Sequence, residues 1–415
     1  MIKLLHFADV HIGMENYGRT DPSTGLSTRV MDFLRRMDEM VGFAEQQAID
    51  LAIFAGDAFK TRNPNPTFQR EFAWRILDLA KICPVVLLVG NHDLPINVKK
   101  ASSLEIYDTL RVPNVTVGDQ YELHQIATKR GPVQVATAPY PVRARLLEGD
   151  EELSTRRTLA DLDSALRRQL EVVIRELAQQ ASQSDAPRIL TGHFWVDGAV
   201  TGSERQVMIG RDIAIGLAEI ADPAWDYVAL GHVHRHQNLT SGRKDTPPVI
   251  YSGSMERIDF SEEGDEKGFV YAEIERGHTQ WEFVPLPKSR PFLTVRVDVR
   301  HAGNPTQVVL EEIARTNVED AVVRVIIKTD PETHNLIQMK VIEQTIRESG
   351  ASIVAAIQRD VQHPTRMRLG PTPEGLSPVE LMERYFQSKE VLPERIDELL
   401  RAAQEFFVEE DGVGY

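Results

Sequence analysis

Short, nearly continuous apolar runs recur through the first 290 residues of the chain and alternate with segments that have helical spacing. Such runs predict buried strands of a layered α/β structure, because a strand covered on both faces has no polar side. The expected strands lie at 2–8, 51–55, 84–89, 133–138, 188–191, 227–230 and 249–251. The expected helices lie at 30–47 and 159–181, with further apolar stripes of helical spacing at 68–79 and 104–110.

The pattern changes at the proline-rich stretch 285–291, which indicates a domain boundary. Strands are then expected at 292–299, 321–328 and 352–358, with helices at 306–315 and 336–348 between them. This order predicts a small β-α-β-α-β domain packed on a larger one. The predicted division is a large domain (1–287), a small α/β domain (288–362), a Pro- and Gly-rich linker (363–378) and a C-terminal helical segment (379–415).

The C-terminal segment combines acidic residues with apolar stripes at helical spacing. One interpretation is that these stripes pack back onto their own chain. The other is a docking arm whose apolar face enters a groove on a partner protein. The residues that would contact such a partner are Tyr385, Phe386, Ile396, Leu399, Leu400, Phe406 and Phe407.

Length and composition restrict the class of protein. A chain of 415 residues exceeds one ordinary core, and 42% hydrophobic with 26% charged residues is typical of globular domains. No run approaches the roughly 20 apolar residues of a membrane span, and Asp9 and His11 in the N-terminal apolar run argue against a signal peptide. The single cysteine, Cys83, excludes an internal disulfide framework and a cysteine-based zinc site. We expect a cytoplasmic protein that does not contact membranes.

The net charge of −15 argues against a general nucleic-acid binder, which is normally basic. The acidic residues are unevenly distributed, because residues 376–415 hold 10 acidic and 4 basic side chains. This tail therefore accounts for 6 of the 15 excess negative charges. The charge weakens a function on nucleic acid without excluding it.

Side chains of the types that bind metal ions follow the predicted strands at their carboxyl ends, where the sites of open α/β sheets assemble. They are Asp9, His11, Asp57, Asn91, His193, His232 and His234. His232 and His234 lie two residues apart, so both can face one point if the backbone is extended there. Glycine precedes four of the seven residues and allows the backbone and a phosphate to approach closely.

The chemistry of this set is specific, because it offers oxygen and imidazole nitrogen and no thiolate. Seven ligands are too many for one small cation and suit two cations that share a carboxylate. Such ligands favour manganese or iron, with zinc possible, whereas magnesium normally accepts fewer imidazoles. Two cations about 3.5–4 Å apart activate water and stabilise charge in displacements at phosphorus.

Five motifs resemble those of the calcineurin-like metallophosphoesterases: Asp9-Val-His11, Gly56-Asp57, Gly90-Asn-His-Asp93, Gly192-His193 and Gly231-His-Val-His234. The segments 6–13, 193–199 and 251–268 resemble, more narrowly, the SbcD family, the nuclease subunits of bacterial SbcCD complexes and counterparts of the eukaryotic Mre/Rad nucleases. The resemblance covers residues 1–290 well and the remainder mainly in layout and length. It implies an α/β fold: a β-sandwich flanked by helices, a small α/β capping domain and a C-terminal helical arm.

The resemblance also implies how two Mn²⁺ ions are held, with Mg²⁺, Fe²⁺ or Zn²⁺ as possible substitutes. The first ion would bind Asp9, His11, Asp57 and His234, and the second Asp57, Asn91, His193 and His232, so that Asp57 bridges. The family places a histidine that matches His92 near the phosphate, with Asp93 beside it to orient the ring. An imidazole with a pKa near 6.5 can protonate the leaving 3′ oxygen or stabilise the pentacovalent phosphate. The alternative for His92 is a purely structural role.

The partners implied by the resemblance are DNA, a second copy of the chain and an SbcC-like ATPase of the ABC/SMC type. The homodimer would form through the helices after the second and third motifs, although burial in the monomer explains their apolar stripes equally well. ATP hydrolysis would belong to the partner, because this chain has no Gly-x-x-x-x-Gly-Lys-Ser/Thr loop. Basic residues near the motifs that can track a DNA backbone are Arg62, Lys99, Lys100, Arg143, Arg145, Arg205, Arg211, Arg235 and Arg257.

The leading hypothesis is therefore a manganese-dependent DNA nuclease of repair and recombination, with 3′–5′ double-strand exonuclease and single-strand endonuclease activity. A phosphodiesterase or phosphatase acting on nucleotides or small phosphoesters would use the same two metals. A compact phosphatase, however, needs neither the small domain nor the apolar tail. A non-catalytic scaffold would have a degraded ligand set, whereas all seven ligands are present here.

Overall fold

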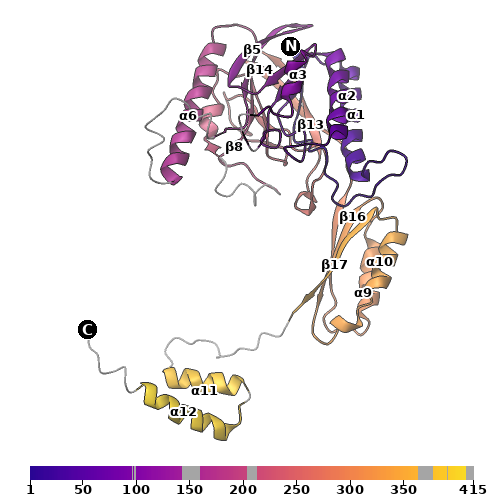
Figure 1. Cartoon of the computed structure of the whole chain (residues 1–415), viewed down its shortest axis with the longest axis vertical. Coiled ribbons are helices and arrows are strands. Elements are labelled where there is room, and N and C mark those ends of the chain that lie inside the picture. The colour runs from indigo at the N-terminus through magenta and orange to yellow at the C-terminus, as the bar shows by residue number, and fades with distance from the viewer. Residues whose placement is uncertain are drawn as a thin grey trace, which may run out of the picture. The chain divides into compact units, whose positions relative to one another are not determined.

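A computed structural model describes residues 1–95, 97, 100–142, 159–202, 213–362, 377–389 and 391–407. Residues 1–296, 310–326 and 338–358 form one compact unit, and the remaining described residues form a second. The first unit contains two six-stranded sheets with helices on their outer faces: α1 and α2 on one side and α6 on the other (Figure 1). The predicted sandwich flanked by helices is confirmed.

The parallel strands of each sheet end at one edge, which is what positions the site. In the first sheet β1 to β4 are parallel, and in the second β6, β7, β10 and β12 are parallel. The first sheet has the order β14 (His278–Pro285), β13 (Gly268–Glu275), β1 (Ile2–Phe7), β2 (Leu51–Phe54), β3 (Val85–Leu88) and β4 (Val115–Gly118). The second has the order β11 (Gln237–Asn238), β12 (Val249–Tyr251), β10 (Tyr227–Gly231), β7 (Arg188–His193), β6 (Gly131–Ala138) and β5 (Glu122–Thr128).

The helices begin and end where capping residues allow it. Ser27 is the N-cap of α1, and its hydroxyl accepts a hydrogen bond from Arg29 N. Asn65 is the N-cap of α2, and Pro66 is the first residue of that helix. Helix α1 ends at Ala48, which adopts a left-handed conformation. The helices and short elements of this part are α1 (Thr28–Gln47), α2 (Pro66–Ile82), α3 (Glu105–Thr109), α6 (Leu159–Ala181), α8 (Leu217–Ile220), η1 (Phe260–Glu262) and the two-stranded ladder β8 (Trp195–Val196) with β9 (Ala214–Ile215).

Alternate residues of each central strand enter different cores. Leu4 points between the two sheets, where it joins residues such as Ile189, whereas Leu5 and Phe7 face α1 and α2. Residues of α6 such as Leu170 cover the outer face of the second sheet. The central strands of both sheets are thus buried on both faces, which is why they form continuous apolar runs in the sequence.

The sequence pattern did not predict seven of the described strands of this unit, which are β4, β5, β13 and β14 and the two-residue strands β8, β9 and β11. In β5 and β14 half-buried and exposed residues alternate, so these edge strands have no continuous apolar run. Strands β13 and β14 form a hairpin that turns at Arg276 and Gly277, and Gly277 adopts a positive φ of 75°. The sequence could have predicted this hairpin, because apolar and polar residues alternate on both sides of Gly277.

The predicted β-α-β-α-β order after residue 291 is observed as a three-stranded sheet in the order β15-β16-β17. Its strands have residues in both compact units, so the boundary at 287 and 288 remains a prediction. Its elements are β15 (Phe292–Asp298), α9 (Pro305–Arg315), β16 (Val322–Thr329), η2 (His334–Leu336), α10 (Met339–Glu348) and β17 (Ile353–Val361).

The C-terminal segment contains two helices, α11 (Pro378–Ser388) and α12 (Pro393–Phe407), that pack against each other (Figure 1). A capping box between Ser377 and Glu380 starts α11, with Pro378 in its first turn. Within the described residues, no helix combines the length and apolarity needed to cross a membrane. The cytoplasmic location remains a prediction.

Candidate metal centre

All seven predicted ligands lie at the shared edge where the parallel strands of both sheets end. Asp9 follows β1, Asp57 follows β2 and Asn91 follows β3, while His193 ends β7 and His232 follows β10. Six of the seven are buried and Asn91 is half-buried. The strand-end positions predicted from sequence therefore meet in one place.

Unusual backbone conformations turn four of these side chains toward one another. Asp9, His11, Asp57 and His232 have φ of 52°, 47°, 63° and 92°, in the left-handed region that non-glycine residues rarely adopt. Each such residue costs about 1–3 kcal/mol and persists only where its surroundings enforce it. Here Asp9 N donates to the Gly56 carbonyl at 2.9 Å and His11 N to the Asp57 carbonyl at 3.1 Å. The fold thus maintains strain at the predicted ligands.

One half of the site gathers ligand atoms of Asp9, His11 and His234, which lie within 4.8 Å of one another. The Nε2 atoms of His11 and His234 are only 3.0 Å apart. In His234 the Nδ1 atom faces the Glu262 carboxylate at 2.8 Å, so Nδ1 carries the proton and Nε2 presents a lone pair. Nitrogen lone pairs converging with a buried carboxylate fit a divalent cation.

The other half gathers around the side-chain oxygen of Asn91. This Oδ1 atom lies 3.1 Å from His193 Nε2 and 3.0 Å from His232 Nδ1. Asp57 Oδ2 lies 3.4 Å from His193 Nε2 and 3.8 Å from His11 Nε2, so one carboxylate faces both halves. The donor set thus fits two cations with Asp57 between them, as the resemblance implies.

The pKa values of the site are shifted because its carboxylates and imidazoles are buried close to one another. Burial raises the pKa of Asp9 to about 6. Burial also acts to raise the pKa of Asp57, but the imidazoles of His193 and His92 hold it well below its usual range. Burial acts to lower the pKa of His193, and the Asp57 carboxylate nevertheless raises it to about 9. These buried carboxylates are stabilised by positive charge, which metal cations would supply in place of imidazole protons.

Residues 2–236 match the family model of the calcineurin-like phosphoesterases. The chain belongs to this family. Among curated proteins it is similar to the SbcD component of the nuclease SbcCD from Bacillus subtilis, with 29% identity over 304 residues, 70% of this chain and 71% of the relative. The same component from Rhodobacter capsulatus is 29% identical over 306 residues, again 70% and 71% of the two chains. A dimetal phosphatase from Danio rerio aligns with a TM-score of 0.41 and 11% identity, over 68% of this chain and 95% of that one.

Family membership identifies the chain as a metallophosphoesterase, hence a hydrolase that uses divalent metal ions. His92 lies at the edge of the phosphoesterase site, where its ring centre is 4.9 Å from that of His11. Its backbone N–H donates to Asp57 Oδ1 at 2.8 Å, and its Nδ1 faces the Lys60 carbonyl at 2.7 Å. Ligand atoms of His11, Asp57 and His92 also lie within 4.8 Å, so distance alone does not separate a catalytic from a ligand role for His92.

The expected role of Asp93 differs from what the phosphoesterase structure shows. Its carboxylate does not orient the His92 ring, which the Lys60 carbonyl holds instead. Asp93 is fully buried and accepts bonds from the backbone N–H groups of Asp57 at 2.9 Å, Ala58 at 3.0 Å and Gly90 at 3.0 Å. It therefore ties the loop that carries Asp57 to the loop that carries His92, because unpaired buried amides are costly.

Sequence reasoning missed Tyr140 and Glu262 of the phosphoesterase site. The ring centre of Tyr140, which follows β6, lies 5.9 Å from that of His232 and 6.4 Å from that of His193. Glu262 lies in the segment 251–268, which carried the narrower resemblance without a role for any single residue. The resemblance of that segment could have pointed to Glu262 as a site residue. For Tyr140 the only indication in the sequence was its position directly after a predicted strand.

Four of the nine predicted DNA contacts lie in the described part of the phosphoesterase. Arg62, Lys100 and Arg235 are exposed, and Arg235 faces Asp265 at 3.7 Å. The Arg257 guanidinium is half-buried and donates to the backbone carbonyls of Asp265 at 2.7 Å and of Arg290 at 3.3 Å. All four stay predictions, and those outside the described residues are Lys99, Arg143, Arg145, Arg205 and Arg211.

Proposed function

We propose that the chain is a DNA nuclease that hydrolyses phosphodiester bonds with two metal ions, preferably Mn²⁺. Its activities would be 3′–5′ exonuclease on double strands and endonuclease on single strands, in DNA repair and recombination. The observation that carries the proposal is one buried centre of two carboxylates, four imidazoles and an amide oxygen with His92 at its edge. The likeness to the SbcD component of SbcCD nucleases over 70% of the chain supports DNA as the substrate.

Each group of the site has a part in this reaction. Asp57 would join the two halves, and the remaining six ligands would divide between them as the distances group them. Bound divalent cations would activate water and stabilise the charge that develops on the phosphate. Because the Lys60 carbonyl accepts the proton of His92 Nδ1, Nε2 is the atom that exchanges a proton with the substrate. When protonated, it donates to the leaving 3′ oxygen.

The direct test is cleavage of end-labelled DNA by the purified chain. With Mn²⁺ we expect 3′ ends of double strands to shorten and single strands to be cut internally, and we expect a chelator to stop both reactions. Mg²⁺, Fe²⁺ and Zn²⁺ are compared at equal concentration. Asn91→Ala removes the oxygen that faces His193 and His232, and it should abolish cleavage.

The matched control is His278→Ala, which removes an exposed histidine of β14 and should cleave like the wild type. A small chromogenic phosphodiester is assayed beside the DNA. Turnover of the small diester with DNA untouched, even at low salt and with the ATPase present, would contradict the nuclease and favour a small-molecule phosphodiesterase.

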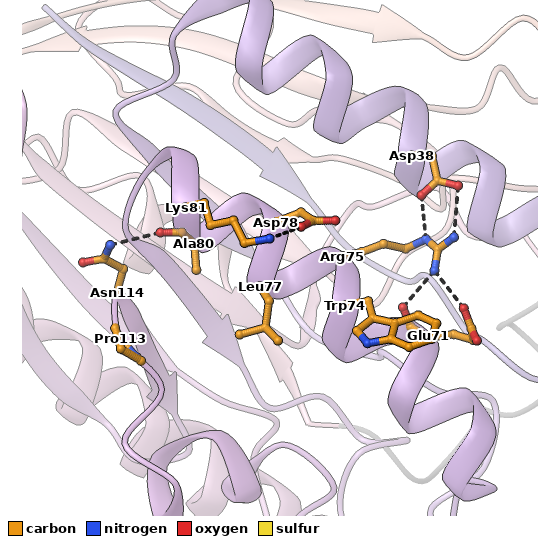
Figure 2. Close-up of a pocket in the computed structure, with 10 residues that line it drawn as sticks. All are labelled: Asp38, Glu71, Trp74, Arg75, Leu77, Asp78, Ala80, Lys81, Pro113 and Asn114. Atoms are coloured by element: carbon orange, nitrogen blue, oxygen red, sulfur yellow. Dashed lines mark hydrogen bonds and ion pairs between the residues drawn. The ribbon is translucent and has the colours of Figure 1, made fainter.

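We further propose that the chain forms a homodimer through α2 and α3. Figure 2 shows part of this surface, where Trp74 and Leu77 of α2 border a hollow of about 790 Å³. These two side chains are 52% and 38% exposed, and Ile106 and Leu110 of α3 are 49% and 68% exposed. Phe72, by contrast, belongs to the monomer core, so only part of the predicted stripe is explained by burial. Neighbouring exposed apolar side chains are typical of an interface.

We also propose that α11 and α12 bind an SbcC-like ATPase. Ile396 is buried, while Tyr385 is 45% exposed and Phe386, Leu399 and Leu400 are half-buried. For Phe406 and Phe407 only the helical backbone is described, so their contacts stay predictions. A helical pair that keeps apolar residues partly exposed can enter a groove on a partner.

Sedimentation tests both assemblies. We expect the wild type to sediment as a dimer and Leu110→Asp as a monomer, because a buried carboxylate at the interface would be unpaired. Leu336→Asp, at an exposed leucine outside α2 and α3, is the control and should remain dimeric.

With the ATPase added, the full chain should co-sediment with the ATPase, and a chain ending at residue 362 should not. A monomeric wild type, or binding by the shortened chain, would overturn the respective proposal.

A further inference from the structure

A buried ion pair stands directly behind one predicted metal ligand. Glu262 and Lys267 both have fully buried side chains, and Lys267 Nζ lies 2.8 Å from Glu262 Oε2. The other carboxylate oxygen, Oε1, lies 2.8 Å from Nδ1 of His234. The two oxygens of one carboxylate thus bind an ammonium group on one side and an imidazole on the other.

Lys267, Glu262 and His234 each form further hydrogen bonds. Lys267 Nζ also donates to Ser254 Oγ at 2.9 Å and to the carbonyl of His234 at 3.2 Å. Glu262 Oε2 accepts a bond from Ile258 N at 3.1 Å, and Ser254 N donates to the His234 carbonyl at 3.0 Å. Residues of segment 251–268 therefore form hydrogen bonds with both the side chain and the backbone carbonyl of His234.

This arrangement decides how His234 presents itself to the site. A carboxylate accepts hydrogen bonds only, so Glu262 requires the proton of a neutral His234 to be on Nδ1. Nε2 then carries the lone pair, and it is Nε2 that lies 3.0 Å from Nε2 of His11. The negative charge of Glu262 also makes the imidazole a stronger donor to a cation. Lys267 compensates that charge and keeps the carboxylate in place.

We propose that Glu262 is a positioning residue of the metal centre, which acts through His234 and is itself fixed by Lys267. The proposal deepens the proposed function and rests on its two-metal site, although not on the identity of the substrate. Fold stability alone does not explain the pair, because apolar residues of similar volume often replace a buried ion pair without loss of stability. Its position behind His234 does explain why two charges are kept in the core.

The test is calorimetric titration of the metal-free chain with Mn²⁺. Glu262→Gln should weaken binding at one of two sites by about 10- to 100-fold. In this variant the amide oxygen is attracted to Lys267 and Ile258 N, so the NH₂ group faces His234 Nδ1 and favours the wrong tautomer. Glu262→Leu/Lys267→Met removes both charges, so it should fold stably while binding Mn²⁺ as weakly as Glu262→Gln.

Asp226→Asn is the control, because it removes the charge of another buried carboxylate at the opposite end of β10, where Asp226 pairs with the exposed Arg276 at 2.5 Å. It should lower the melting temperature and leave Mn²⁺ affinity unchanged. In the DNA assay, Glu262→Gln should need more Mn²⁺ but approach wild-type kcat at saturation.

If either Glu262 variant bound Mn²⁺ as tightly as Asp226→Asn does, the positioning role of Glu262 would be overturned. A wild type that binds two Mn²⁺ without cutting DNA would overturn the nuclease instead, and the affinities would still decide the role of Glu262.

Discussion

Replacing His92 with alanine is expected to lower kcat for DNA cleavage by about 10²- to 10⁴-fold, the usual contribution of a positioned acid or base. The imidazole is fixed by the Lys60 carbonyl at Nδ1 and by its backbone bond to Asp57, so only Nε2 is available for proton exchange. Alanine keeps that backbone bond and removes only the ring. Mn²⁺ affinity and KM should therefore stay near their wild-type values, which rapid-quench kinetics and calorimetry measure.

The metal content of the variant separates the two roles that distance leaves open for His92. Loss of one Mn²⁺ from His92→Ala would make the residue a ligand and contradict the catalytic role. Unchanged kcat would assign His92 the purely structural role that the sequence also allowed. His278→Ala, the exposed histidine of β14, should change neither quantity.

The seven ligand positions could be predicted from sequence because each is a local feature. Asp57 and Asn91 each follow an apolar run and a glycine, and the carboxyl ends of parallel strands necessarily meet at one edge. The same reasoning located most of the buried strands. It also predicted α6 and its end at Ala181, since the apolar residues of this helix repeat at helical spacing.

The supporting groups could not be predicted, because they depend on how distant segments meet. The group that holds the His92 ring is the carbonyl of Lys60, and a backbone carbonyl has no residue type to recognise. Glu262 reaches His234 across 28 residues of sequence. Asp93 follows His92 directly and was expected to support it, whereas the fold aims its carboxylate at three backbone amides. Adjacency in sequence is a poor guide to which group orients a side chain.

The two sheets are in close contact where Gly231 ends β10, and we expect this contact to set the spacing of the metal centre. A Cβ atom at Gly231 would lie 2.1 Å from the carbonyl oxygen of Ala55 and 2.9 Å from Cβ of Ala8. Ala55 and Ala8 precede the ligands of the first sheet, and Gly231 precedes His232 of the second. The Ala55 carbonyl also faces His193 Nδ1 at 2.7 Å. None of these backbone atoms can move without shifting a predicted ligand.

Gly231→Ala is accordingly expected to act on stability and on the site together. Overpacking of this kind costs about 1–3 kcal/mol of unfolding free energy. A displacement of roughly 1 Å between reacting groups costs about 10²-fold in rate, so kcat/KM for DNA should fall by that factor and Mn²⁺ affinity should fall with it. The control is Gly264→Ala, because Gly264 is exposed and a Cβ there meets nothing within 4 Å. If Gly231→Ala bound Mn²⁺ and cut DNA like Gly264→Ala, the two sheets would not set the spacing of the metal ligands.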